Sequence, residues 1–102
     1  MRGNFQVQKV SLAFHCKPGQ GEALLAAFTT ALVETRAFDG CRQVETYVSQ
    51  DDQDLIVLLE DWESRAHYER YLAWRLENGL QETLEPVLAS PLEMRYLDLT
   101  AI

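Results

Sequence analysis

Apolar and polar residues alternate along the first part of the chain, residues 5–16. One side of this segment is apolar and consists of Val10, Leu12, Phe14 and Cys16. A period of two is typical of a strand with one buried face, because successive side chains of a strand point to opposite sides. The Lys-Pro-Gly run at residues 17–19 ends the predicted strand.

Residues 22–36 change to a helical period. Their apolar positions fall on one stripe: Leu24, Leu25, Phe28, Ala31 and Leu32. This stripe predicts a helix with one buried side. Asp39 and Gly40 then predict a turn, residues 41–49 alternate as a second strand, and the polar residues 50–54 lead into a third. So short a link predicts that these two strands pair antiparallel.

The third strand is apolar on both sides. Residues 55–59 are Leu-Ile-Val-Leu-Leu, and Glu60, Asp61 and Trp62 follow. A strand that is hydrophobic at both parities is buried on both faces. Parity places Trp62 on the same face as Glu60. A carboxylate and an indole at the end of a strand either line a pocket or brace the turn into the next helix.

The last part of the chain predicts helical segments and a strand. Ser64 is the expected N-cap of a helix that runs to Gly79, a residue suited to left-handed backbone. A shorter helical segment, residues 80–88, leads to a final strand, residues 92–99. The order strand, helix, strand, strand, helix, strand predicts an α+β, ferredoxin-like βαββαβ fold with a four-stranded antiparallel sheet.

This topology places the first strand beside the third and the fourth, with the helices on one face of the sheet. The third strand then needs a second cover, which a chain of 102 residues does not supply. We therefore expect a twofold homodimer, sheet against sheet. Cys16 and Cys41 fall on strands that are not neighbours and lack metal-type spacing, so we interpret both as reduced packing residues.

Length and composition narrow the range of functions. A chain of 102 residues, 47% of them hydrophobic, is one folded domain, residues 1–102. The net charge of −7 argues against nucleic acid and anionic membranes as partners, since both are bound through clustered Lys and Arg. A small aromatic molecule fits better. No signal peptide, membrane span or metal site is indicated, so we expect a cytoplasmic protein.

Several segments together resemble one known family. They are the run SLAFHCKPGQGEALLAAF, the Asp39-Gly40-Cys41 turn, and Glu60-Asp61-Trp62 followed by a helix. Over residues 7–99 the chain resembles the antibiotic biosynthesis monooxygenase family of dimeric α/β barrels. The resemblance implies that fold and a cofactor-independent oxygenation. In that chemistry a phenolic or quinol-type substrate loses a proton and reacts with dioxygen directly, without metal or flavin.

One departure from the family pattern bears on cofactors. The haem-degrading branch of this family ligates iron through a helical histidine, about nine or ten residues after the tryptophan. Tyr71 and Leu72 occupy these positions here. The difference argues against haem, and we expect no cofactor.

The helix after Trp62 predicts the wall of a ligand pocket. Its inward side carries aromatic and polar side chains: His67, Tyr68, Tyr71, Leu72, Trp74, Arg75 and Asn78. A plain core helix would carry Leu, Val or Ala at the middle of that side. The observed mixture is typical of a pocket wall, apolar in body with a few polar tips.

We predict catalytic roles for three residues. His67 is a candidate general base, with His15 as a second candidate, because the pKa of imidazole suits proton transfer near neutral pH. Arg75 is a candidate for stabilising the resulting oxyanion. Trp62 would hold the aromatic ring of the substrate. The predicted substrate-binding residues are Phe14, His15, Tyr68, Tyr71 and Trp74.

Each role has a structural alternative. Trp62 is equally suited to packing that locks the helix to the third strand, and Arg75 to lying across Tyr71 with its charge in water. We interpret Glu60 as a structural acceptor for helix-start N–H groups or for Arg75.

Two other functions stay open at this stage. The same dimer would also suit a binding or regulatory module that captures a small aromatic ligand without turnover. A cofactor-free isomerase or cyclase would use the same deprotonation, but its products would gain no oxygen atom.

Overall fold

The computed structural model describes residues 7–102, and it confirms the predicted order of elements. They are β1 (Gln8–His15), α1 (Gln20–Ala37), β2 (Cys41–Val48), β3 (Leu55–Trp62), α2 (Arg65–Glu77), α3 (Leu80–Leu84) and β4 (Glu93–Leu97). The helix predicted for residues 80–88 ends earlier than expected, at Leu84. Residues 5 and 6 of the predicted first strand lie outside the described residues.

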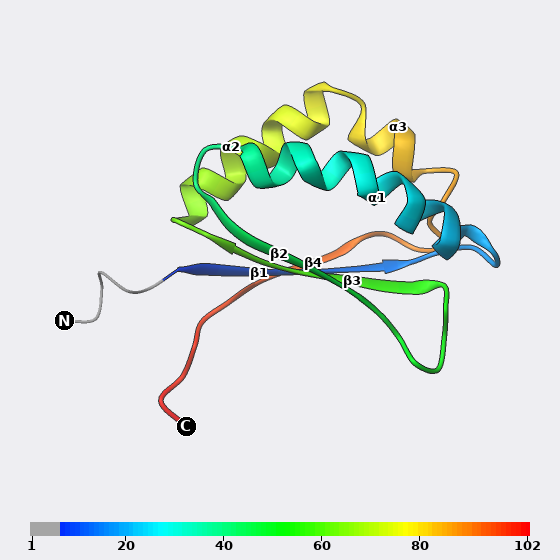
Figure 1. Cartoon of the computed structure of the whole chain (residues 1–102), viewed down its shortest axis with the longest axis horizontal. Coiled ribbons are helices and arrows are strands. Elements are labelled where there is room, and N and C mark those ends of the chain that lie inside the picture. The colour runs from blue at the N-terminus through cyan, green and yellow to red at the C-terminus, as the bar shows by residue number, and fades with distance from the viewer. Residues whose placement is uncertain (1–6) are drawn as a thin grey trace.

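The four strands form one antiparallel sheet in the order β2-β3-β1-β4. The predicted position of β1, between β3 and β4, is therefore confirmed. All three helices lie on one face of the sheet, and no described element covers the other face (Figure 1). This is the predicted α+β, ferredoxin-like arrangement.

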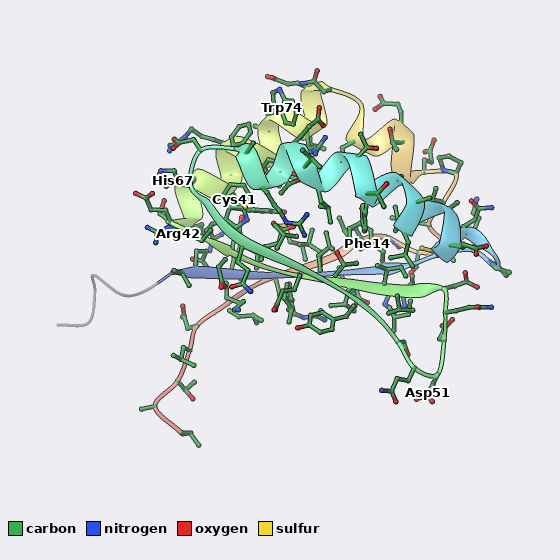
Figure 2. All side chains as sticks on the ribbon, viewed as in Figure 1. Phe14, Cys41, Arg42, Asp51, His67 and Trp74 are labelled. Atoms are coloured by element: carbon green, nitrogen blue, oxygen red, sulfur yellow. The ribbon has the colours of Figure 1, made fainter. Side chains whose placement is uncertain are left out.

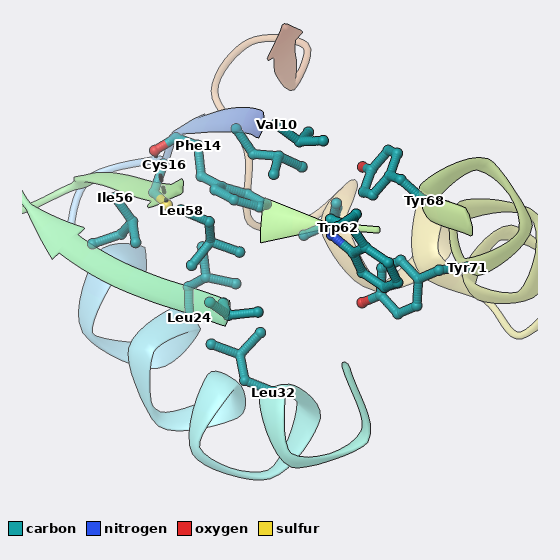
Figure 3. Packing of buried hydrophobic residues seen from close by; sticks show 13 residues of the cluster. Val10, Phe14, Cys16, Leu24, Leu32, Ile56, Leu58, Trp62, Tyr68 and Tyr71 are labelled. Atoms are coloured by element: carbon teal, nitrogen blue, oxygen red, sulfur yellow. Dashed lines mark hydrogen bonds between the residues drawn. The ribbon is translucent and has the colours of Figure 1, made fainter. Parts of the chain in front are cut away.

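The core lies between the sheet and the helices. Its strand residues are those that the alternation of positions predicts to point toward one face of the sheet. The apolar side of β1 and the residue after it is buried, and on β3 the buried residues are Ile56, Leu58, Glu60 and Trp62. Figure 3 shows the result: aliphatic side chains pack between α1 and the sheet, and Trp62, Tyr68 and Tyr71 gather beside α2. The strand parity thus decides which residues meet the helices.

The uncovered face of the sheet, called the open face below, is apolar at its centre. Leu55, Val57 and Leu59 of β3 form a row there, next to Ala13 of β1. At one end of the row Lys9 and Asp61 form an ion pair, with Nζ and Oδ1 2.8 Å apart. The open face is the one for which the sequence predicts a second copy of the chain.

The N-terminus of α1 is held by the hairpin between β2 and β3. The backbone N–H groups of Gly19 and Gly21 donate to the two carboxylate oxygens of Asp54, at 3.1 and 2.9 Å. Gly21 permits this approach, because a Cβ there would lie 2.3 Å from the carbonyl oxygen of Gln53. The carboxylate satisfies helix N–H groups that have no partner within the helix and interacts favourably with the helix dipole.

We expect Asp54→Ala to lower the free energy of unfolding by about 1 to 2 kcal/mol, because it removes both bonds to the start of α1. Urea denaturation measures this difference. Asp51→Ala is the matched control, since Asp51 is exposed in the same hairpin and lies at its tip, away from α1 (Figure 2). Equal stability of the two variants would contradict the role given to Asp54.

Candidate functional site

A cavity of about 150 Å³ lies between the sheet and the helices. An engineered apolar cavity of similar size in another protein holds benzene, so this space accommodates one aromatic ring. Most of its lining is apolar and includes Leu12, Phe14, Leu24, Phe28, Leu58 and Leu84. Three lining residues, Ala27, Asn78 and Thr83, are exposed, which places the mouth between α1 and the α2–α3 corner.

The cavity has an aromatic end and a polar end. At the aromatic end the rings of Phe14 and Phe28 meet edge to face, with centroids 5.4 Å apart. At the other end the lining includes five side chains that carry hydrogen-bonding groups, apart from Asn78 and Thr83 at the mouth: Thr35, Glu60, Tyr68, Tyr71 and Arg75. A ligand with one polar substituent on an aromatic ring suits this division.

Glu60 is a buried carboxyl group at the polar end, with only 2% of its surface exposed. Its neighbours across the sheet are apolar, Val10 on β1 and Val44 on β2. Oε1 accepts a hydrogen bond of 2.8 Å from the indole Nε1–H of Trp62. Glu60 is thus an acceptor, but the predicted donors, helix-start N–H groups or Arg75, were wrong: Trp62 donates instead, because residues two apart on a strand point to the same face.

Burial raises the pKa of Glu60 above its usual range, against the opposing effects of the Trp62 hydrogen bond and the Arg75 charge. Desolvation disfavours the charged carboxylate, whereas both neighbours favour it. The pKa of Glu60 thus moves toward neutral pH. A carboxyl group with this property is a candidate acid or base.

Trp62 packs in the core and is not part of the cavity lining. Its ring centroid lies 5.0 Å from that of Tyr71 and 5.6 Å from that of Tyr68. Phe38 extends the same cluster to Trp74, 5.5 Å away, and Trp74 also lies outside the lining. Of the two alternatives for Trp62, packing that locks α2 to β3 describes the geometry.

Arg75 borders the cavity and ties α2 to α1. Its Nε donates to the hydroxyl of Tyr71 at 2.8 Å, and its Nη2 donates to the Ala31 carbonyl at 2.7 Å. Nη1 pairs with Glu34 at 3.1 Å. The Tyr71 hydroxyl also lies 2.7 Å from Thr35 Oγ1. The polar end is therefore built mainly from bonds within the protein.

The two histidines lie away from the cavity. His67 Nδ1 is 2.6 Å from Ser64 Oγ, and its ring packs on Gly40, where a Cβ would come within 2.5 Å of it. Ser64 accepts from the His67 backbone N–H, which confirms the predicted N-cap. His15 lies on the open face, 3.5 Å from Glu93. Figure 2 shows His67 at one end of the molecule, whereas Phe14 points in between the layers.

The structure therefore brings together only part of the predicted site. Phe14, Tyr68, Tyr71 and Arg75 line one cavity. The lining residues that the sequence analysis did not assign to the site include Leu24, Phe28, Thr35, Glu60, Leu84 and Leu92. For Glu60 a signal was present, namely a charged residue at a buried parity between Leu58 and Trp62.

Two further properties bear on the kind of site. Within residues 7–102 no group of three or more His, Cys, Asp and Glu side chains is placed to hold a metal ion. In the same range no helix combines the length and hydrophobicity needed to cross a membrane. Both cysteines are free thiols.

Residues 8–75 match the family model described as antibiotic biosynthesis monooxygenase. The match spans β1 to most of α2 and so includes both the Glu60-Trp62 pair and the Tyr71-Arg75 pair. No curated protein is significantly similar to the sequence.

Several solved structures share the fold. Rv0793 from Mycobacterium tuberculosis is 25% identical, with a TM-score of 0.80 over 95% of this chain and 98% of that one. SO0527 from Shewanella oneidensis is 26% identical, with a TM-score of 0.74 over 90% and 92%. A monooxygenase from the gene ActVA-Orf6 of Streptomyces coelicolor, in complex with the ligand nanaomycin D, is 21% identical, with a TM-score of 0.77 over 94% and 89%.

We expect Glu60→Gln to stabilise the protein in a pH-dependent manner. A carboxyl group whose pKa is raised on folding favours the folded state at low pH, and this contribution is lost as the pH rises through the folded-state pKa. Glutamine never ionises. The melting temperature of Glu60→Gln minus that of the wild type should therefore increase as pH rises from 4 to 8. Thermal denaturation at a series of pH values measures this gain. A difference that is constant with pH would contradict the raised pKa.

Proposed function

The chain belongs to the antibiotic biosynthesis monooxygenase family, and from this premise we propose that it is a cofactor-independent monooxygenase of a phenolic or quinol-type small molecule. The observation that carries this proposal is the cavity, which has apolar walls, room for one aromatic ring and a buried carboxyl at one end. The similar monooxygenase that was solved with nanaomycin D supports a ligand site in this fold.

In the proposed reaction the substrate hydroxyl lies at the polar end, and the ring lies toward Phe14 and Phe28. Loss of the hydroxyl proton makes the ring electron-rich enough to react with dioxygen directly. One oxygen atom enters the product, and the other leaves as water with two hydrogens from the substrate. The Arg75 charge beside Tyr71 favours the anion, and the mostly apolar walls strengthen that interaction.

A cavity of about 150 Å³ limits the substrate. One ring fits inside, so a substrate with several fused rings extends through the mouth beside Ala27, Asn78 and Thr83. The reacting ring is then the one nearest the polar end.

We also propose that the protein is a homodimer formed through the open face. The support is the row of Leu55, Val57 and Leu59, which is apolar although no described element covers it. Contact between two such faces removes apolar surface from water in both copies.

The proposed activity predicts oxygen uptake by chelator-treated protein with one or more members of a panel of quinols, anthrones and related phenols. Ala27→Trp should lower kcat/KM at least about tenfold, because it narrows the mouth and misplaces the ring. Ala26→Trp is the matched control, since Ala26 is the adjacent exposed residue of α1 and does not line the cavity. An oxygen electrode and mass spectrometry with isotopically labelled dioxygen give the rate and the product.

Three outcomes separate the candidate functions. Labelled oxygen in the product supports the monooxygenase. A product without labelled oxygen indicates an isomerase or cyclase. Tight binding of a compound with no turnover indicates a ligand-binding module.

The proposed dimer predicts that the wild type sediments as a dimer at micromolar concentration and that Val57→Lys sediments as a monomer. A charge at the centre of the open face cannot be buried without a partner. Val33→Lys, on the outer side of α1 at 63% exposure, should leave the dimer intact. A monomeric wild type would exclude the proposed assembly.

A further inference from the structure

We propose that Glu60 is the general base of this site and that Trp62 positions it. The class of substrate, a phenol, is taken from the proposed function. One carboxylate oxygen of Glu60 accepts the proton of the substrate hydroxyl, while the other stays bonded to the Trp62 indole. This proposal differs from the prediction made from the sequence, in which a histidine is the general base.

The first support is the arrangement of the two carboxylate oxygens. Oε1 is occupied by the Trp62 Nε1–H at 2.8 Å. Among the described residues no hydrogen bond reaches Oε2, because the one bond to the Glu60 carboxyl is that of Trp62 to Oε1. Glu60 is 2% exposed and lines the cavity, so a donor to Oε2 can come from a ligand in the cavity. A buried acceptor without a partner is costly unless a ligand supplies the donor, and a phenolic O–H is such a donor.

The second support is the lack of a competing base in the lining. The other ionisable lining residues are Tyr68, Tyr71 and Arg75, which are all protonated at neutral pH. Burial raises the pKa of both tyrosines further. His67 and His15 lie outside the lining. Glu60 is therefore the lining residue able to take up a proton.

The groups around Glu60 make it basic but still able to ionise. Val10 and Val44 on the neighbouring strands are apolar and favour the neutral acid. From α2, Tyr68 and Tyr71 approach as neutral phenols and Arg75 as a positive charge, and Cys41 is the nearby thiol on β2. Burial is the largest effect and raises the pKa of Glu60.

The proposed step is a proton transfer. The O–H bond of the phenol breaks, an O–H bond to Oε2 of Glu60 forms, and the electron pair stays on the phenolate oxygen. No oxidant or reductant takes part in this step. Trp62 keeps the carboxylate in place through its indole N–H, and the aromatic cluster around the indole keeps Trp62 in place.

Infrared titration of the ligand-free protein tests the base directly. The band of a protonated carboxylic acid should persist above the usual pH range of glutamate and should be missing in Glu60→Gln. In Trp62→Phe its midpoint should move to higher pH, because the hydrogen bond that stabilises the carboxylate is gone. A Glu60 carboxyl that titrates in the usual range overturns the proposal, and so does an unchanged midpoint in folded Trp62→Phe.

A second test uses 4-nitrophenol, a single-ring phenol whose anion absorbs visible light. At a pH where the free compound is neutral, binding to the wild type should produce the absorption of the anion. Glu60→Gln should bind it as the neutral phenol, and Glu60→Asp should restore part of the ionisation. Glu63→Gln is the matched control, because Glu63 is exposed just beyond β3. No binding, or equal ionisation in wild type and Glu60→Gln, overturns the proposal.

The proposed monooxygenase activity and the proposed role of Glu60 can be rejected independently of each other. Ionisation that depends on Glu60 without oxygen uptake across the panel rejects the oxygenase and leaves the base in place. If the oxygenase is active, Glu60→Gln should lower kcat/KM by about 10² to 10⁴-fold and remove the acid limb of its pH profile. Oxygen uptake that is unaffected by Glu60→Gln keeps the oxygenase and overturns the base.

Discussion

The hydrogen bond between the Trp62 indole and the Glu60 carboxyl is the interaction on which the rest of the site depends. A carboxyl group placed between apolar strands loses its hydration, and an unpaired one would be too costly to keep there. The indole satisfies one oxygen and is itself fixed by contacts with Tyr68 and Tyr71. These contacts also seat α2 on β3, so the carboxyl and the helix that covers it are placed by the same cluster.

The polar end of the cavity is largely satisfied by the protein itself. Arg75 bonds to Tyr71, to the Ala31 carbonyl and to Glu34, so most of its donors are not free for a ligand. Arg75 therefore acts on the cavity mainly through its charge and through the position of the Tyr71 hydroxyl. The chemistry open to a ligand is correspondingly simple: one carboxylate oxygen, one fixed phenol and a nearby positive charge.

The site and the open face share a strand. On β3, Glu60 faces the cavity, whereas its neighbours Leu59 and Asp61 face the other way. Because the side-chain period of a strand is two, a slip by one residue would exchange the two sets. The same register that buries the carboxyl therefore exposes the apolar row on which the proposed dimer depends. The hydrophobic residues of β3 on one face pack against the helices, and those on the other face form the apolar row of the open face.

The sequence by itself determined the direction of each side chain. Strand parity put Trp62 with Glu60, helical periodicity turned Tyr71 and Arg75 inward, and the Ser64 cap set the start of α2. Only the tertiary structure decided which inward residues share a cavity. Periodicity gives an angle around a helix but not a position along it, so His67 on the same arc falls beyond the end of the cavity. Contacts from α1, distant in sequence, fixed the partners of Arg75.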